Sequence, residues 1–313
     1  MSVGVTSGYY VSGQTTNSYA GNFIPEIWSG KLQVKFYKST VLGEITNNDW
    51  EGEIKDQGDK VNIRTIPTIT ISDYTKGMSL ASQVPVSTPI TLTIDYGKYF
   101  NVVVDDVDAT QADVKLMDMF TNDAAQQMKI AIDGLVLSNI ANAGGTTAAA
   151  TANQGNTAGA ISGGIALGTT ASPITLTKTT VLDTILNMGQ TLDEQNVPED
   201  GRWLVIPAWM AAMIKGSDLK QAYLTGDSVS PLRNGKIGMI DRFTVYVSNN
   251  LYTASSKWTI MSGTRDAISF ASQITNVETL RSTTTFGNIM RGLNVFGFKV
   301  VKPEALVTAV VTK

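Results

Sequence analysis

The sequence contains neither cysteine nor histidine among its 313 residues. Thiol nucleophiles, Ser-His-Asp triads, histidine general bases, zinc sites and disulfides each depend on one of these two residues, so the composition excludes them. The absence of cysteine identifies no cellular compartment by itself, although it excludes a small secreted scaffold held by disulfides. The function must therefore need neither a thiol nor an imidazole.

Charge is also scarce. Charged residues make up 16% of the chain, whereas ordinary soluble domains average about 25%. The 24 Lys and Arg residues against 27 Asp and Glu leave a net charge of -3, so no overall positive field exists to hold nucleic acid or an anionic membrane. Because hydrophobic residues remain at 42%, we expect a surface that is polar but uncharged, or one that other protein covers.

Long apolar runs and cofactor motifs are missing as well. No run approaches 18 apolar residues, and no basic residue precedes Lys31. We therefore expect neither a membrane span nor a signal peptide, and predict a soluble, unexported chain. The loops GxGxxG, GxxxxGK[ST] and GxSxG do not occur, and we predict no cofactor.

One acidic cluster could hold a cation. Asp105, Asp106 and Asp108 offer oxygen ligands of the kind that Ca²⁺ and Mg²⁺ prefer. Their spacing does not follow the calcium-loop pattern, and Asp108 followed by Gln111 fits a helix N-cap with its reciprocal partner. We favour the capping role and predict no metal site.

A second acidic group could support acid–base chemistry. Glu194, Glu199 and Asp200 flank a proline-bearing turn, where paired carboxylates would allow a carboxylate-based hydrolase. Charged residues in a turn are usually just solvated, and no nucleophile motif accompanies them. We predict no catalytic residue and no enzymatic activity, and keep the hydrolase as an alternative from a different class.

The first hundred residues suggest parts that cannot fold alone. Residues 1–22 are uncharged Gly, Ser, Thr, Asn and Tyr, which predicts an arm lying against something else. Apolar residues at three-to-four spacing predict one or two short helices over 23–45. Apolar and polar residues alternate over 60–71 and 90–94, which predicts two strands of a hairpin. The connection between them, 72–89, is far longer than a tight turn. Such a ribbon is marginally stable alone, so it needs a partner surface, which could be another subunit.

The middle of the chain predicts a long helix. It begins at Asp108 and runs to Ile140, about 32 residues or roughly 48 Å. Its inward face is predicted to carry Met117, Phe120, Ala124, Met128, Ala131 and Leu135. Residues 143–172, nearly all Ala, Gly, Thr, Asn and Ser, predict a flexible or β-wrapped insertion.

The remainder alternates helix and strand irregularly. Thr180 is expected to cap a helix, and NVPEDGRWLVIP predicts a turn followed by a buried strand and then a helix over 208–214. Strand signals follow at 236–247, 257–261, 267–271 and 293–301. The fold class is therefore mixed α+β without regular βα alternation.

Several segments, in their order, carry a family resemblance. They are KVNIRTIP, PITLTIDYGKYF, VDDVDATQAD, LDEQNVPEDGRWLVIP, GKIGMIDRFTVYVSNN and GLNVFGFKVVKPEALVTAVV. Together they resemble the major capsid proteins of tailed bacteriophages, which have the Hong Kong 97-type fold. The resemblance implies an N-terminal arm (1–50), an extended E-loop (51–98), a peripheral P-domain with a long spine helix (99–178 and 290–313) and an axial A-domain (179–289).

The resemblance also implies a function and partners. Such subunits form pentamers and hexamers of an icosahedral head around double-stranded DNA, with a portal and in some cases decoration proteins. No long charged helical segment of the fused-scaffold kind is present, which implies a separate scaffolding protein, or none. The implied location is the virion capsid, and the host cytoplasm during assembly. Candidate intersubunit contacts are Lys60, Arg64, Tyr74, Lys76, Arg233 and Lys236.

Related assemblies remain as alternatives. An encapsulin-like nanocompartment shell shares the fold but encloses protein cargo, and a tail-tube protein is disfavoured by the long helix. Lys76 lies where some family members carry a crosslinking lysine, but no acceptor Asn or catalytic Glu can be matched to it. The sequence thus favours a structural shell subunit over these alternatives.

Overall fold

The computed structural model describes most of the chain beyond its first 34 residues. The chain divides into residues 1–35 and residues 36–313, and the described residues are 35, 37–50, 60–67, 69–106, 116–141, 167–168, 170–217, 238–283 and 285–313. The expected arm, the Asp108 cap and nearly all of the expected insertion lie outside this part. Of the helices expected over 23–45, the described residues contain α1 (Leu42–Ile45).

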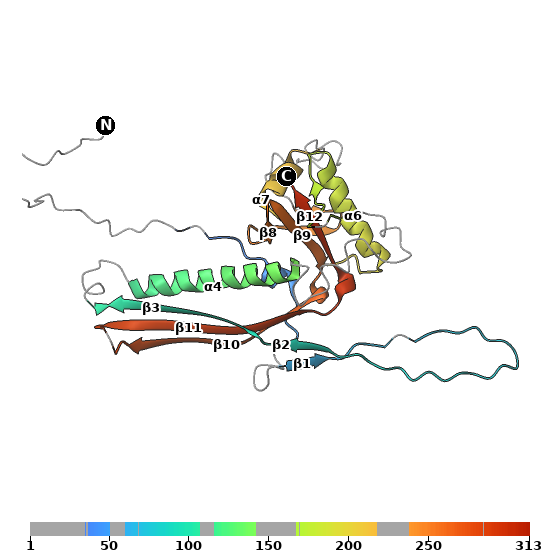
Figure 1. Cartoon of the computed structure of the whole chain (residues 1–313), viewed down its shortest axis with the longest axis horizontal. Coiled ribbons are helices and arrows are strands. Elements are labelled where there is room, and N and C mark those ends of the chain that lie inside the picture. The colour runs from blue at the N-terminus through green and yellow to red at the C-terminus, as the bar shows by residue number, and fades with distance from the viewer. Residues whose placement is uncertain are drawn as a thin grey trace, which may run out of the picture. The chain divides into compact units, whose positions relative to one another are not determined.

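A three-stranded antiparallel sheet supports the long helix. Its order is β10 (Ile268–Arg281), β11 (Gly287–Val300) and β3 (Tyr96–Asp105), and α4 (Leu116–Ala141) runs along it (Figure 1). Burial alternates strictly along most of β3, because successive side chains of a strand point to opposite faces. One face therefore packs toward α4, while most of the other carries exposed side chains.

The second sheet is mixed and forms the larger core. Its order is β4 (Ile174–Thr175), β12 (Leu306–Thr312), β9 (Lys257–Thr264), β5 (Arg202–Ile206), β7 (Phe243–Val247) and β6 (Met239–Ile240), with β8 (Thr253–Ala254) beside β9. Every residue of β5 is buried, as expected for a central strand covered on both faces. The helices α6 (Thr180–Glu194) and α7 (Ala208–Lys215) contribute to this core.

The sequence located several of these elements, missed the strand β12 and misplaced one cap. The helix expected from Thr180, the buried strand and the helix over 208–214 are confirmed. The hydroxyl that caps α6 is that of Thr177 rather than Thr180. The Thr180 N–H donates to Thr177 Oγ1 at 3.2 Å, and the Thr177 N–H donates to Thr180 Oγ1 at 2.9 Å. Two threonines thus form a reciprocal capping box, a role that Glu or Gln usually completes.

The inward face of α4 differs from the predicted one. Phe120 and Ala131 are exposed, and Met128 and Leu135 only border the core. The buried positions lie in the last turns of the helix and comprise Ile132, Asp133, Val136, Leu137 and Ile140. The prediction was wrong at Phe120 and Ala131, while Met128 and Leu135 do pack against the core. A search for apolar residues also passes over Asp133, which is buried on this face.

The base of the ribbon packs on its own subunit. Strands β1 (Lys60–Ile63) and β2 (Ile90–Thr93) pair antiparallel, with Val61 opposite Leu92. Their apolar side chains join a small cluster with Ile94, Ala271 and Val301. A Cβ added at Gly297 would overlap the Thr93 carbonyl oxygen, so the ribbon crosses β11 where only glycine leaves room.

This crossing yields a prediction. Gly297→Ala should lower the free energy of unfolding by about 1–3 kcal/mol, because the added methyl must displace the backbone of β2. Gly97→Ala is the matched control on β3, where an added Cβ meets nothing within 4 Å. Chemical denaturation of the disassembled subunit measures both. Equal stability of the two variants would mean that the ribbon base shifts freely on β11.

Candidate assembly interface

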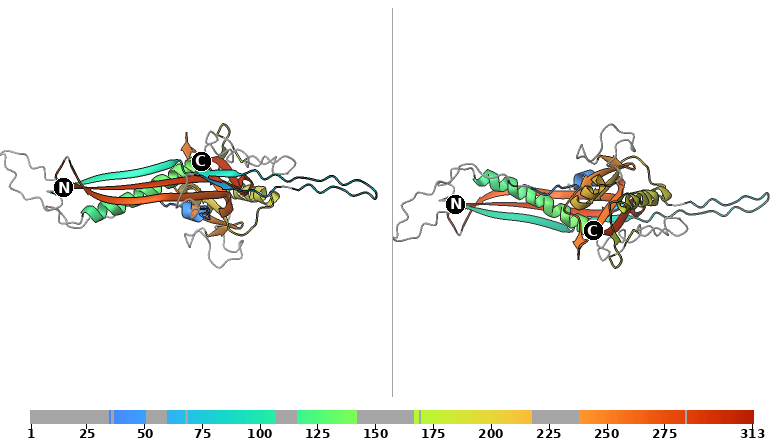
Figure 2. Two further views of the ribbon diagram at one scale, coloured as in Figure 1. Left: turned by 90° about the horizontal axis from the view of Figure 1, so that it is seen from below. Right: turned by 90° about the horizontal axis from the view of Figure 1, so that it is seen from above.

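Beyond its base the ribbon continues as two extended arms. They run side by side from β1 and β2 to a tip (Figure 2). At the tip the Met78 N–H donates to the Thr75 carbonyl oxygen at 3.1 Å, and Gly77 has φ of 89°. These features fit a type II turn with Lys76 and Gly77 at its centre. The expected hairpin with its long connection is confirmed, since β1 and β2 pair antiparallel. The first strand ends at Ile63 rather than at residue 71, and the connection closes in a turn at its tip.

Side chains link the arms where a backbone ladder would be expected. Thr65 Oγ1 donates to the Thr88 carbonyl oxygen at 2.6 Å. The side-chain amide of Gln83 accepts from the Thr70 N–H at 3.1 Å and donates to the Thr70 carbonyl at 2.8 Å. The Gln83 side chain thus hydrogen-bonds both the N–H and the carbonyl oxygen of Thr70. The arms are tied together without burying their side chains against each other.

The arms carry a large exposed apolar surface. Ile71 is 89% exposed and Val84 is 85% exposed, and four further apolar side chains of the arms are also exposed, namely Ile66, Ile69, Leu80 and Val86. Monomeric soluble proteins rarely expose contiguous apolar patches of this kind, whereas interaction sites do. The arms are therefore built to contact another molecule.

The predicted contact residues divide between described and undescribed parts of the chain. Lys60, Arg64, Tyr74 and Lys76 all lie on the ribbon with exposed side chains. Arg233 and Lys236 lie outside the described residues. Sequence reasoning selected charged side chains and Tyr74, and missed the apolar side chains that dominate the exposed surface of the arms.

A second exposed apolar surface lies on the three-stranded sheet. Tyr99 and Leu293 are directly paired neighbours on β3 and β11, and both are exposed, as are Val103 and Leu280. An ion pair of 2.7 Å joins Arg291 to Glu278 across β11 and β10. This face is the one that α4 leaves uncovered, and it offers an apolar platform to a neighbouring molecule.

Arg202 gives a structural reason for the segment LDEQNVPEDGRWLVIP. Its side chain is buried at the start of β5, where Nε donates to the Pro198 carbonyl at 2.9 Å and Nη2 to the Val197 carbonyl at 2.6 Å. Nη1 forms an ion pair of 2.7 Å with Asp193. The motif from Leu192 to Pro207 is therefore a clamp, in which one guanidinium holds the turn between α6 and β5.

Arg242 extends this clamp to the β6–β7 hairpin. Its guanidinium forms ion pairs with Asp193 at 2.8 Å and with Glu199 at 2.7 Å. Burial would raise the pKa of the Asp193 carboxyl, but the hydrogen bonds from Arg202 and Arg242 outweigh it and hold that pKa below its usual value. A carboxylate that accepts two guanidinium hydrogen bonds thus stays ionised into the acid range.

The lowered pKa predicts a pH dependence. A depressed carboxyl pKa stabilises the fold at pH values above about 4, and this stabilisation disappears as pH falls through the folded-state value. Asp193→Asn should therefore reduce the free energy of unfolding at pH 7 and have progressively less effect below about pH 4. Denaturation of wild type and variant across pH 3–7 measures the difference. If the difference in the free energy of unfolding between wild type and variant stayed constant down to pH 3, the lowered pKa of Asp193 would be contradicted.

Asp133 gives a structural reason for the end of the segment GKIGMIDRFTVYVSNN. Its Oδ1 accepts hydrogen bonds from the Val41 and Leu42 N–H groups, both at 3.0 Å, and Oδ2 accepts from Asn250 Nδ2 at 2.7 Å. Ser248 Oγ donates to the Ser39 carbonyl at 3.1 Å. Burial raises the pKa of the Asp133 carboxyl, although these hydrogen bonds oppose the shift. The junction joins the segment before α1, the long helix and the loop after β7.

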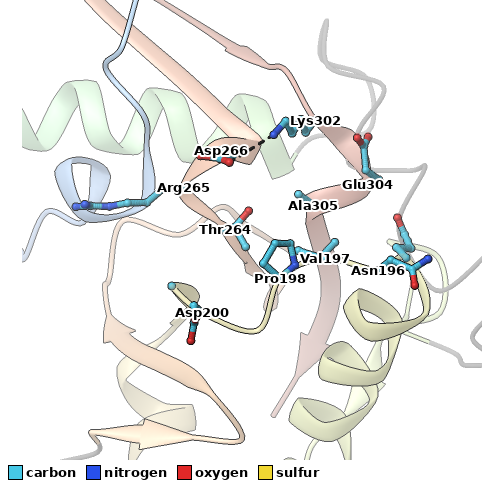
Figure 3. Close-up of a pocket in the computed structure, with 12 residues that line it drawn as sticks. Asn196, Val197, Pro198, Asp200, Thr264, Arg265, Asp266, Lys302, Glu304 and Ala305 are labelled. Carbon is cyan, nitrogen blue, oxygen red and sulfur yellow. Dashed lines mark hydrogen bonds and ion pairs between the residues drawn. The ribbon is translucent and has the colours of Figure 1, made fainter. Parts of the chain in front are cut away.

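The carboxylates considered for hydrolysis have separate roles. Glu194 accepts a hydrogen bond from Gln190, and Glu199 pairs with Arg242. Asp200 lines a pocket formed by residues 195–198, 200–201, 264–266, 302 and 304–305 (Figure 3). Lys302 in that pocket already pairs with Asp266 at 3.4 Å. Glu194 and Glu199 thus have structural partners, and Asp200 is the one of the three that lines the pocket.

The acidic cluster after β3 also has a structural partner. The Arg281 guanidinium binds both carboxylate oxygens of Asp106, joining the ends of β10 and β3. Within the described residues, no group of three or more acidic side chains could hold a metal ion. In the same part of the chain no helix has the length and apolarity needed to span a membrane.

Comparison with known proteins agrees with these features. A family model described as phage capsid protein matches residues 88–309. A chain of the Mycobacterium phage Che8 structure is 27% identical, with 93% of this chain and 97% of that chain covered and a TM-score of 0.75. No curated protein sequence matches the chain.

More distant solved structures share the fold. A capsid chain of cyanophage P-SCSP1u is 14% identical over 97% of both chains, with a TM-score of 0.68. A capsid chain of a native GTA particle is 12% identical over 94% of this chain and 98% of that chain, with a TM-score of 0.65. The α+β architecture is thus the Hong Kong 97-type capsid fold. Since the family model spans well over half of its length, the chain belongs to the phage capsid protein family.

Proposed function

We propose that this chain is the major subunit of a tailed-phage head, assembling with copies of itself into pentamers and hexamers of a closed icosahedral shell. The observation that carries the proposal is the ribbon, whose arms expose apolar side chains that the subunit cannot cover. In a shell each ribbon lies against a neighbour, which removes that surface from water. The uncovered face of the three-stranded sheet supports the same arrangement.

The role is structural rather than enzymatic. Cysteine and histidine are absent, and of the three carboxylates considered for hydrolysis, Glu194 and Glu199 have structural partners while Asp200 lines a pocket. Contacts between copies are then the whole activity. We propose that Lys60, Arg64, Tyr74, Lys76, Arg233 and Lys236 lie at or near these contacts.

We further propose the division into arm, E-loop, P-domain and A-domain, with one refinement. Strands β10 and β11 pair with β3, so they belong with the long helix in the P-domain. Strand β12 pairs with β9 in the sheet of β5, so it belongs with the A-domain. Sheet membership thus shifts the proposed boundaries from those that the resemblance implies.

The proposed partners are double-stranded DNA, a separate scaffolding protein, a portal and decoration proteins, with assembly in the host cytoplasm. A net charge of -3 fits a shell that encloses DNA without binding its phosphates through an excess of Lys and Arg. The molar mass of the purified chain by light scattering tests the assembly. Megadalton particles are expected, and a mass near 33.5 kDa at every concentration would contradict it.

The content of native particles separates the two kinds of shell. A phage head is expected to hold DNA that nuclease cannot reach until the shell is opened. Native particles that enclose protein cargo and no nucleic acid would instead identify a nanocompartment.

A further inference from the structure

The ribbon keeps one register from its base to its tip. In the base, Lys60 pairs with Thr93 and Ile63 with Ile90. Further out, Thr65 is bonded to Thr88 and Thr70 to Gln83, and the turn closes with Thr75 bonded to Met78. Each step along one arm is matched by an equal step along the other. The arms therefore continue the hairpin without a bulge, although side chains replace much of its ladder.

This register sorts the side chains of the ribbon into two faces. Directly paired residues lie on the same face of an antiparallel hairpin, and neighbours along a strand lie on opposite faces. One face carries Val61, Ile63, Ile69, Ile71, Leu80, Val84, Val86, Ile90 and Leu92, with Asp73 as its charged residue and Thr65, Thr75, Ser82 and Thr88 as its uncharged polar residues. The other carries Lys60, Asn62, Arg64, Thr70, Ser72, Tyr74, Ala81, Gln83, Ser87 and Thr91, with Ile66 as its large aliphatic residue.

The apolar face changes its environment along its length. At the base, Ile63 and Leu92 are buried against Ala271 and Val301 of the same subunit. Further out, the same face continues with Ile71 and Leu80, which are exposed. An apolar stripe that begins in the core and continues beyond it is stabilised only if another surface covers its outer part.

Resting on the proposed function, we propose that the ribbon docks on a second copy of this chain through its apolar face alone, with its polar face turned to solvent. The uncovered sheet face around Tyr99, Val103 and Leu293 gives every copy an apolar surface of matching chemistry. Charged side chains are depleted from the centres of protein interfaces, as they are from this face. Lys60, Arg64 and Tyr74 then border the contact instead of filling it.

Lysine substitutions at neighbouring positions test the proposal. Ile71→Lys and Leu80→Lys alter the apolar face, while Ser72→Lys and Ala81→Lys add the same charge one residue further along, on the polar face. All four positions are exposed in the subunit, so subunit unfolding should be unchanged in each variant. Light scattering measures the protein concentration at which assembly begins.

We expect Ile71→Lys and Leu80→Lys to raise that concentration more than tenfold, and Ser72→Lys and Ala81→Lys to change it less than twofold. Equal effects on both faces, or a larger effect at Ser72 and Ala81, would overturn the one-sided contact while leaving the shell function intact. Wild-type protein that stays as single subunits would instead contradict the proposed function, and this inference with it.

Discussion

Replacing residues 66–87 by an Asn-Gly turn is expected to give a folded subunit that forms no shells. The substitution removes both exposed arms but keeps β1, β2 and the cluster around Ala271, so the core of the subunit is untouched. Asn-Gly suits a two-residue hairpin turn between the remaining strands. Cooperative thermal unfolding should persist, while light scattering should detect only small species at concentrations where wild type assembles.

Two results would oppose this expectation in different ways. Loss of the cooperative unfolding transition would mean that the arms belong to the core of the subunit. Shells of normal size from the shortened chain would mean that the arms are dispensable for assembly. A longer deletion that removed Ile90 would confuse these outcomes, because Ile90 packs beside the cluster at the base.

Val136→Asp is expected to prevent folding, whereas Phe120→Asp should be tolerated. Val136 is fully buried on α4, and a carboxylate there would lie without a partner one turn from the buried Asp133. Such a charge costs several kcal/mol, on the order of 4–5 or more. Phe120 is 36% exposed on the same helix, and its replacement should cost less, about 1–2 kcal/mol.

Soluble yield and chemical denaturation of the two variants decide the point. Insoluble Val136→Asp beside soluble Phe120→Asp is the expected pair of results. The opposite pair would show that the originally predicted face of the helix, with Phe120 inward, is the buried one.

The sequence predicted part of the order of elements, because local patterns determine it. The strand predicted within NVPEDGRWLVIP is β5, since a short apolar run bounded by turn residues is typical of a buried strand. Strands β3 and β12 were not predicted. The face of α4 was not predictable in this way. The residue that marks its orientation, Asp133, is a carboxylate buried by hydrogen bonds from Val41, Leu42 and Asn250, all distant in sequence.

The sequence predicted that the ribbon contacts a partner, but it did not predict which side chains of the ribbon would make the contact. A thin apolar stripe on a long hairpin indicated that the ribbon needs a partner. The tight turn at Lys76 and Gly77 was missed because the prolines and glycine of the arms suggested a loop. The links through Thr65 and Gln83 replace ladder bonds, and periodicity carries no signal for such contacts.

The clamp formed by Arg202 gives a structural reason for one of the segments that carry the family resemblance. Arg202 and Asp193 stood out in the sequence only as part of a resemblance. The structure gives them a physical reason, since a buried guanidinium bonded to two carbonyls and a carboxylate allows few substitutes. A lone buried arginine at the start of an apolar strand is the signal that could have revealed this clamp.

Electron microscopy of the purified full-length chain tests the central claim most directly. The account predicts closed, hollow shells of uniform diameter, built from pentamers and hexamers of a single protein. It also predicts that these shells are absent from preparations of the chain with residues 66–87 replaced. Dispersed subunits in the wild-type preparation, over the whole concentration range in which the protein stays soluble, would contradict the account.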